Sequence, residues 1–480
     1  ATPEQELAYA LATAISVLDE LKTRVPNGEF PELCGRLSFF VNAGIRFVTE
    51  MCKMRAFVDL WDEILIERYG IENPKFRRFR YGVQVNSLGL TEQQPENNVY
   101  RILIEMLAVT LSKKARARAV QLPAWNEALG LPRPWDQQWS MRMQQIMAFE
   151  TDLLEYEDLF DGNSVVDTKV EALKTSARYE LKTIESQGGA LESIDYMKSR
   201  LVESNTLRLQ NIESKQTTVV GVNKYINTEE SPLVSGDGGI MVVDPLVEKD
   251  QIDRLNKWRA SRNQTTVENA LNNLRKAALA GKNIMPASIE AAKAGATTGE
   301  WAQEMRNIYG EYRGPTGVAA GISNQTEGLD EIRSAVDAVS DKLGERLKFL
   351  IGKPGLDGHS NGAEQIASRA RDCGMKIEYE GIRLTPQELV DTVKTSKAHV
   401  IGLSILSGSH IPLVQDMMTL LAEEGLMNIP VVVGGIIPEE DKSKLLQMGI
   451  AKVYTPKDFE MNTIMMDIVN LAEPREIAAE

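Results

Sequence analysis

The stretch Lys348-Phe-Leu-Ile-Gly-Lys-Pro-Gly-Leu-Asp-Gly-His-Ser-Asn-Gly362 decides how the C-terminal part of this chain folds. It opens with an apolar run typical of a buried strand, and a helical pattern follows its last residue. His359 is therefore predicted at the carboxyl end of a strand, with the carboxylate of Asp357 two residues before it. In metal sites, a histidine commonly turns one ring nitrogen to the metal while the other donates to a carboxylate. The motif predicts a metal ligand at His359, and a helix-capping or surface histidine is the alternative.

Four further apolar runs follow the first, and helical patterns separate all five. The runs cover residues 348–352, 375–380, 398–406, 430–434 and 452–455. This alternation predicts a parallel, doubly wound sheet over residues 336–480. If its strand order is flavodoxin-like, ligands bind at the carboxyl ends of the first and third strands, where the order reverses. The fourth run ends in Gly434-Gly435, where missing side chains let a bulky ligand approach the backbone.

Three motifs in this region resemble the cobalamin-binding domain of B12-dependent mutases and methionine synthases. The family pattern D-x-H-x-x-G, S-x-L and G-G is present as Asp357/His359/Gly362, Ser404/Leu406 and Gly434/Gly435. The resemblance implies a flavodoxin-like (Rossmann-like) domain that binds adenosylcobalamin, with His359 as the lower axial ligand of cobalt. It implies that Asp357 is the partner of this histidine and that Lys353 stands behind Asp357. The residues implied to bind the cofactor in this domain are Lys353, Asp357, Gly358, His359, Gly362, Ser404, Leu406, Gly434, Gly435 and Tyr454.

Composition places the chain among soluble globular proteins of two or three domains. It has 480 residues, of which 43% are hydrophobic and 25% charged, and no apolar run approaches the length that spans a bilayer. No signal peptide is visible, so we expect a cytoplasmic protein without a membrane partner. The net charge of −14 argues against a nucleic-acid partner. The three cysteines are too few and too scattered for a disulfide framework or a zinc site, which predicts buried, reduced thiols.

The rest of the chain reads as part of a (β/α)8 TIM barrel over residues 1–170, followed by a helical linker over residues 171–335. The barrel part alternates helical patterns with strand candidates such as residues 79–85. Apolar residues at three- and four-residue steps over residues 47–65 predict a core-facing helix. The linker is polar and helical with glycine breaks, and residues 219–225 are a strand candidate within it.

Motifs outside the predicted sheet resemble the barrel of the B12-dependent acyl-CoA mutases. Arg36-Leu-Ser-Phe-Phe40 matches the family's R-L-S-F-F. Further matching segments are residues 90–98, 126–129, 221–225 and 310–317. The resemblance covers nearly the whole chain, and within the family residues 133–139 and 143–150 are most like the ethylmalonyl-CoA mutases.

The resemblance also implies two groups of binding residues in the barrel. Those implied to hold the phosphates and tail of coenzyme A are Arg36, Ser38, Lys75 and Arg80. Guanidinium groups suit this polyanion, and a solvated surface charge is the alternative for each basic residue. Gln84 and Glu127 are implied to contact the adenosyl ribose of the cofactor. Glu127 taken alone reads equally well as an acid at the start of a helix.

The resemblance places the family's substrate-binding arginine and glutamine and its Tyr-His pair before Ala1, so no catalytic residue is assigned in this chain. About five of the eight strands of a barrel are then expected to be absent. Because three strands cannot close a barrel, we expect a further segment or chain to supply the first half of the barrel and turnover to require it. The family also implies a homodimer and a GTPase chaperone as partners.

The resemblance therefore implies a radical mutase that rearranges the carbon skeleton of an acyl-CoA substrate, from ethylmalonyl-CoA to methylsuccinyl-CoA. Methylmalonyl-CoA mutase is the alternative within the enzyme class, because side chains around the acyl group choose the substrate. A non-catalytic cobalamin carrier or regulator is the alternative outside it, and such a protein has no need of the barrel motifs. Of the other histidines, His399 is expected at a core or edge position, and His410 is a candidate beside the nucleotide tail.

Overall fold

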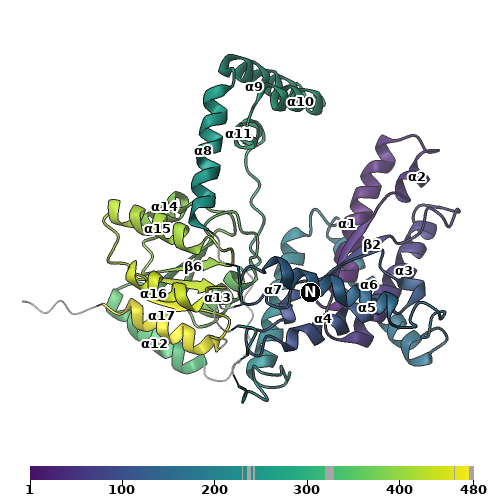
Figure 1. The fold of residues 1–480 in the computed structure, drawn as a ribbon, viewed down its shortest axis with the longest axis horizontal. Helices are drawn as coiled ribbons and strands as arrows, with labels where there is room; N and C mark the ends of the chain where they lie inside the picture. The colour runs from purple at the N-terminus through teal and green to yellow at the C-terminus, as the bar shows by residue number, and fades with distance from the viewer. Residues whose placement is uncertain (230, 235–238, 242–243, 319–328, 459, 475–480) are drawn as a thin grey trace, which may run out of the picture. The chain divides into compact units, whose positions relative to one another are not determined.

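The computed structural model describes residues 1–229, 231–234, 239–241, 244–318, 329–458 and 460–474 (Figure 1). Contacts group the chain into two compact units. One comprises Ala1–Met241 and Pro315–Glu480, and the other comprises Val242–Gly314. This grouping differs from a division at residues 170 and 335, which stays a prediction. Within the described residues, no helix is both long and apolar enough to cross a membrane.

A three-stranded parallel sheet forms the first part of the larger unit. Its strands are β1 (Phe39–Ala43), β2 (Tyr81–Val85) and β3 (Ala119–Gln121), in the order β1-β2-β3. Burial alternates along β2 with a period of two, so one face of the sheet lies in the core and the other does not. The helices between the strands are α3 (Phe47–Glu67) and α4 (Asn97–Thr110), which gives the strand-helix alternation expected of a barrel segment.

The helices around this sheet share one hydrophobic core. Met51, Met54, Trp61 and Leu65 of α3 are buried, as their spacing predicted. Helix α1 (Pro3–Arg24) and helix α6 (Ser164–Ser186) pack against each other, and α6 also packs against α3. Helix α6 therefore belongs to the core of this part of the chain, although the sequence placed most of it in a linker. The region also contains the short elements α2 (Phe30–Cys34), η1 (Ser87–Gly89) and η2 (Lys113–Ala115), and the longer helix α5 (Pro134–Phe149).

A buried carboxyl in this core responds to pH. Glu105 of α4 is 1% exposed, and its Oε2 has no hydrogen-bond partner. Burial and the nearby carboxylate of Glu50 raise the pKa of Glu105 to about 8, because Arg101 only partly offsets them. The folded protein therefore holds a proton on Glu105 that the unfolded chain releases near its ordinary pKa.

We predict that Glu105→Gln stabilises the protein increasingly as the pH rises from about 5 to about 8. Above the pKa that Glu105 has in the unfolded chain, folding of the wild type must either protonate this carboxyl or bury its charge. The neutral side chain of glutamine avoids both costs. A pKa raised from 4.5 to about 8 corresponds to a stabilisation of roughly 3–5 kcal/mol at the upper end of this range. Thermal melting across this pH range measures the gain, with Glu67→Gln, at an exposed position of α3, as the control. A gain that is the same at pH 5 and pH 8 would contradict the raised pKa.

The C-terminal part of the larger unit is a five-stranded parallel sheet with helices on both faces (Figure 1). Its strands are β4 (Lys348–Gly352), β5 (Lys376–Tyr379), β6 (Val400–Ile405), β7 (Val431–Gly435) and β8 (Lys452–Tyr454). The order β5-β4-β6-β7-β8 is the flavodoxin-like order, so this prediction is confirmed. The reversal of order falls between β4 and β6, and the carboxyl ends of these two strands meet there.

Two hydrophobic clusters fill the two faces of this sheet. One packs the sheet against α12 (Leu329–Leu343), α13 (Asn361–Asp372) and α17 (Met461–Ala472). The other packs it against α14 (Pro386–Ser396) and α15 (His410–Glu423), with Leu445 of α16 (Glu439–Gln447). The central strands β4, β6 and β7 are buried on both sides over most of their length, which explains why they read as continuous apolar runs rather than alternating ones.

The strand expected over residues 219–225 is wrong. Val220 forms only an isolated bridge with Lys224, and the N–H of Gly221 donates to the carbonyl of Lys224. Gly221 and Tyr225 have φ values of +83° and +56°, which lie outside the strand region. The β-branched residues suggested a strand, but these local hydrogen bonds close a turn instead.

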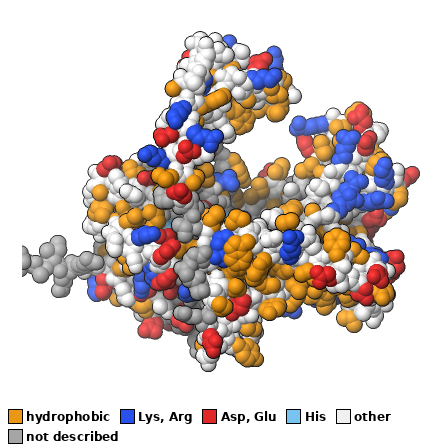
Figure 2. All heavy atoms as spheres, in the orientation of Figure 1, with side chains coloured by type: hydrophobic (Ala, Val, Ile, Leu, Met, Phe, Trp, Pro, Cys, Tyr) orange, Lys and Arg blue, Asp and Glu red, His pale blue; other side chains and the backbone are white. Residues whose placement is uncertain are grey.

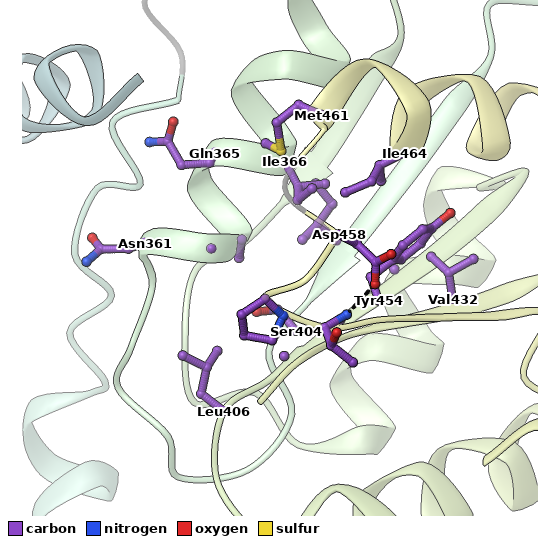
Figure 3. A pocket seen from close by; sticks show the side chains of 18 of the residues that line it. Asn361, Gln365, Ile366, Ser404, Leu406, Val432, Tyr454, Asp458, Met461 and Ile464 are labelled. Carbon is purple, nitrogen blue, oxygen red and sulfur yellow. Dashed lines mark hydrogen bonds between the residues drawn. The ribbon is translucent and has the colours of Figure 1, made fainter. Parts of the chain in front are cut away.

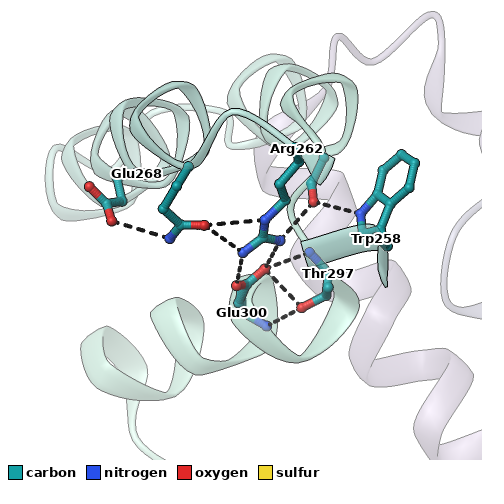
Figure 4. A network of polar contacts seen from close by, with 7 residues as sticks. Trp258, Arg262, Glu268, Thr297 and Glu300 are labelled. Atoms are coloured by element: carbon teal, nitrogen blue, oxygen red, sulfur yellow. Dashed lines mark hydrogen bonds and ion pairs between the residues drawn. The ribbon is translucent and has the colours of Figure 1, made fainter. Parts of the chain in front are cut away.

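The smaller unit is helical and has its own core. Its helices are α8 (Pro245–Ser261), α9 (Gln264–Leu279), α10 (Met285–Ala294) and α11 (Thr298–Tyr309). Arg262 forms a bidentate ion pair with Glu300, whose carboxylate also caps α11 through Thr297 (Figure 4). The ion pair with Arg262 lowers the pKa of Glu300 to about 2. This network ties the end of α8 to the start of α11 and explains why the segment is compact.

Candidate functional site

His359 lies after β4 with one ring nitrogen held and the other free. Its Nδ1 is 2.7 Å from Oδ1 of Asp357, and its backbone N–H donates to the same oxygen at 3.0 Å. The His359 side chain is 78% exposed, whereas that of Asp357 is 5% exposed. No hydrogen bond or ion pair to Nε2 occurs within the described residues. A metal can therefore approach Nε2 while the carboxylate fixes the orientation of the ring.

Two further groups hold Asp357 in place. Lys353 Nζ lies 3.0 Å from Oδ2 of Asp357 and also donates to the carbonyl of Ser404 at 3.1 Å. The backbone N–H of Leu406 donates to the same Oδ2 at 3.3 Å. The motifs at the ends of β4 and β6 thus meet on one carboxylate, which is the arrangement expected at the point where the strand order reverses.

The charge on Asp357 is fixed by its neighbours. Burial alone would raise the pKa of this carboxyl, but hydrogen bonds from the backbone and ring of His359 and from Lys353 lower it to about 2. Burial also lowers the pKa of Lys353, and the contact with Asp357 opposes this effect only in part. Asp357 is therefore ionised over the whole physiological range and accepts the hydrogen bond from His359 as a carboxylate.

A pocket of about 350 Å³ opens beside this relay. Figure 3 shows side chains of α13, β6, β7, β8 and α17 arranged around it. Its apolar wall includes Phe349, Val432, Ile464 and Ile468. Other lining residues are the predicted ones Gly362, Ser404, Leu406, Gly434, Gly435 and Tyr454. The sequence therefore predicted much of one side of a slot that the structure forms.

The donor set of this slot fits a cobalamin. Among the described residues there is no group of three or more His, Cys, Asp or Glu side chains that could hold a metal ion. A corrin ring brings its own equatorial nitrogens, so one protein imidazole such as His359 suffices. Gly402 is needed in the pocket wall, because a Cβ there would lie 2.7 Å from the Phe349 ring. Gln365 Nε2, in the pocket wall, is buried without a partner and is available to a polar ligand atom.

Helix α7 (Ile194–Glu213) supplies a second wall that the sequence did not reveal. Asn205, Arg208 and Leu209 of this helix line the pocket together with Leu88. Contacts that fasten α7 to the sheet region are Thr206 to Gln365, Glu213 to Arg369 and Lys198 to Glu364. No local sequence pattern predicts these contacts, because each joins two residues that are far apart in the sequence.

The predicted coenzyme A residues cluster at the amino ends of β1 and β2. Arg36 and Ser38 directly precede β1, and Arg80 directly precedes β2. Arg80 donates to the carbonyl of Gly35, which brings it beside Arg36. Lys75 and Arg36 are exposed, and Figure 2 shows Lys and Arg side chains gathered close to α2. The cluster presents positive charge at one end of the strands, and its binding role stays a prediction.

Gln84 lies on the face of the small sheet that is not packed into the core. It pairs in register with Asn42 of β1 and Gln121 of β3, so three amide side chains form a row across the sheet. This row is near the carboxyl ends of the strands, opposite the basic cluster. The sequence identified Gln84 but missed Asn42 and Gln121, because their alignment depends on strand register.

Glu127 lies in a turn after β3 that is held by a buried carboxylate. Asp136 accepts from the indole N–H of Trp125 at 3.0 Å and from the side chain of Asn126 at 2.8 Å. Arg133 forms an ion pair with the same group. Burial would raise the pKa of Asp136, but bonds from Arg133, Asn126 and Trp125 lower it. The turn that carries Glu127 is thus held by this charged network, and within the described residues no hydrogen bond joins Glu127 to Gln84.

The other two histidines have structural partners. His399 Nδ1 accepts from the backbone N–H of Lys348 at 3.0 Å, as expected for a residue at the edge of the core. His410 is buried and pairs with Asp441 at 3.0 Å. It does not line the pocket. All three cysteines, Cys34, Cys52 and Cys373, are buried free thiols, as predicted.

Comparison with known proteins connects both sheets to one family. Residues 1–311 match the family model described as methylmalonyl-CoA mutase. The chain belongs to the methylmalonyl-CoA mutase family. Residues 347–458 match the model of the B12 binding domain, which covers the five-stranded sheet and the His359 relay.

Individual members of the methylmalonyl-CoA mutase family differ in their similarity to this chain. An ethylmalonyl-CoA mutase of Cereibacter sphaeroides is 70% identical over 480 residues, covering 100% of this chain and 74% of the relative. The ethylmalonyl-CoA mutase of Methylorubrum extorquens is 59% identical over 478 residues, covering 98% and 69%. A methylmalonyl-CoA mutase of Cereibacter sphaeroides is 30% identical over 459 residues, covering 94% and 63%.

These coverages correct one expectation from the sequence. The chain spans 74% and 69% of the two ethylmalonyl-CoA mutases, which does not support a missing first half of the barrel or a need for it in turnover. The expectation rested on matching Ala1 to one family position and then counting strands. The number of strands expected to be absent does not give the number of residues absent, because strands and the helices between them vary in length.

Proposed function

We propose that this chain rearranges ethylmalonyl-CoA to methylsuccinyl-CoA with adenosylcobalamin as the cofactor. The observation that carries the cofactor assignment is the unpaired Nε2 of His359, backed by Asp357 and Lys353, in a loop that leads directly into Asn361 and Gly362 of the pocket lining. The similarity to two ethylmalonyl-CoA mutases, at 70% and 59% identity against 30% for the methylmalonyl enzyme, supports the choice of substrate.

Residues of the B12 binding domain would hold the cofactor in one orientation. His359 would bind cobalt through Nε2, while Asp357 accepts a hydrogen bond from Nδ1 and fixes the orientation of the ring. Ser404 and Tyr454 would line the slot for the nucleotide tail, and Gly434 would leave room for it. When bound, adenosylcobalamin supplies the radical through homolysis of its cobalt–carbon bond. The protein's part is to position the reactants and to exclude water from them.

The small sheet would align the substrate along its strands. Each of the two longer strands has five residues, which corresponds to about 16 Å. Arg36, Ser38, Lys75 and Arg80 would bind the phosphates of coenzyme A at the amino ends, where guanidinium forks suit such groups. A pantetheine arm of similar length would then bring the acyl group to the carboxyl ends. Gln84 and Glu127 would meet the adenosyl ribose there.

Conversion of ethylmalonyl-CoA tests the proposal directly. The protein is incubated with adenosylcobalamin and either ethylmalonyl-CoA or methylmalonyl-CoA, and the isomeric products are distinguished by NMR. We expect methylsuccinyl-CoA to form at least tenfold faster than succinyl-CoA, since a binding difference of about 1.4 kcal/mol produces a tenfold ratio. A preference for methylmalonyl-CoA would overturn the substrate assignment.

A non-catalytic cobalamin carrier is disfavoured by the barrel segment. The match to the mutase family model over residues 1–311 lies outside the B12 binding domain, and a carrier does not need it. A homodimer and a GTPase chaperone stay predictions.

A further inference from the structure

Arg208 of α7 faces the same pocket as the His359 motif. It lies three residues after Asn205 and one before Leu209, and all three side chains line the pocket. Residues at this spacing share one side of a helix, so the inner side of α7 forms this wall. Within the described residues the guanidinium makes one hydrogen bond, from Nη2 to the carbonyl of Leu88 at 3.2 Å, which leaves most of its donors unused.

The charge of Arg208 has no counter-charge in the described part of the chain. No carboxylate there lies within 4.0 Å of its guanidinium, and burial is the one influence that moves its pKa, which is lowered. Asp458 also lines the pocket, but its carboxylate accepts from the backbone N–H of Thr455 at 2.8 Å. A half-buried cation without an anion is costly unless a ligand supplies the negative charge.

We infer that Arg208 binds the phosphodiester of the cofactor's nucleotide tail and so selects corrinoids that carry this group. The inference rests on the proposed function, because it takes the pocket to be the slot of the tail. The apolar side chains of Phe349, Val432 and Ile468 suit the aromatic base of the tail, whereas the guanidinium suits its singly charged phosphate. Arg208 is a specificity-determining residue rather than a catalytic one.

Binding of two corrinoids tests this role without any turnover. Cobalamin carries the phosphodiester and the base, whereas cobinamide lacks both. We expect Arg208→Gln to weaken cobalamin binding by about tenfold to 100-fold, the loss that accompanies one hydrogen bond to a charged group. Cobinamide binding should change by less than about twofold, and its retention also shows that the variant is folded. Arg208→Lys should recover part of the cobalamin affinity, because it keeps the charge but not the fork.

Arg200→Gln is the matched control on the same helix. Arg200 is exposed, forms an ion pair with Glu203 and does not line the pocket, so both affinities should match those of the wild type. Equal losses for cobalamin and cobinamide in Arg208→Gln would mean a structural role and would overturn the inference. Unchanged cobalamin binding would do the same while leaving the proposed function intact. A wild-type chain that binds neither corrinoid would overturn the proposed function and the inference together.

Discussion

His359→Ala is expected to weaken cobalamin binding by about tenfold to 100-fold or more, because loss of a ligand costs at least as much as loss of its supporting partner. In the wild type, Nε2 of His359 is free and Asp357 holds Nδ1 at 2.7 Å. With cob(II)alamin bound to protein made with isotopically labelled histidine, the nitrogen hyperfine splitting in the EPR spectrum should change with the label. In His359→Ala the cofactor's own dimethylbenzimidazole should return to cobalt, and the splitting should no longer respond to the label.

Two variants make this experiment specific. His399→Ala removes an imidazole that accepts from the Lys348 backbone at the other end of the sheet, and it should leave affinity and spectrum unchanged. Asp357→Asn keeps the shape of the side chain but removes its charge, so we expect a smaller loss than for His359→Ala. An unaltered cobalt spectrum in His359→Ala would refute the assignment of the ligand.

Gly435→Ala is expected to destabilise the B12 binding domain by roughly 3 kcal/mol, toward the upper end of the cost of overpacking. A Cβ at this position would lie 1.8 Å from the carbonyl oxygen of Ile405, and the glycine has a φ of +157°. The obstacle is the backbone of the neighbouring strand β6, which cannot move aside as a flexible side chain can. The two strands must therefore separate at the edge of the pocket.

Gly434→Ala provides the comparison one residue away. A Cβ there would meet Tyr454 Cβ at 3.9 Å, an ordinary contact, so the fold should be retained. The added methyl would still enter the slot, because Gly434 lines it, and cobalamin binding should weaken. Hydrogen exchange over β6 and β7 measures the local stability of both variants. Equal protection in Gly435→Ala and the wild type would show that the strands tolerate the side chain.

The sheet and the His359 relay were predictable because their signals are local. Strands buried on both faces read as apolar runs. Helical patterns between consecutive strands predict that the strands are parallel. Asp357 and His359 are two residues apart, so their contact follows from the turn after β4 alone. Lys353 joins them through the same short loop.

The wall made by α7 and the core of the smaller unit could not be predicted in the same way. Arg208 lines the pocket only because distant segments of the chain pack together. The pattern of polar and apolar residues around it is that of an ordinary surface helix. In the smaller unit, small side chains such as Ala270 and Ala278 are buried beside Val267 and Leu274, so the core has little hydrophobic signal. The Arg262–Glu300 pair also joins the end of α8 to the start of α11, and no local pattern reveals it.

The pocket takes its walls from Leu88, from α7 and from the B12 binding domain. A ligand that fills the pocket touches all three, so its binding free energy also stabilises the packing of α7 against the B12 binding domain. Without a ligand, the polar contacts of Thr206, Glu213 and Lys198 connect the two. Loading of the cofactor is therefore coupled to the cooperativity of unfolding. The loaded protein should melt in a single transition, whereas in the empty protein α7 should separate from the sheet before the sheet itself unfolds.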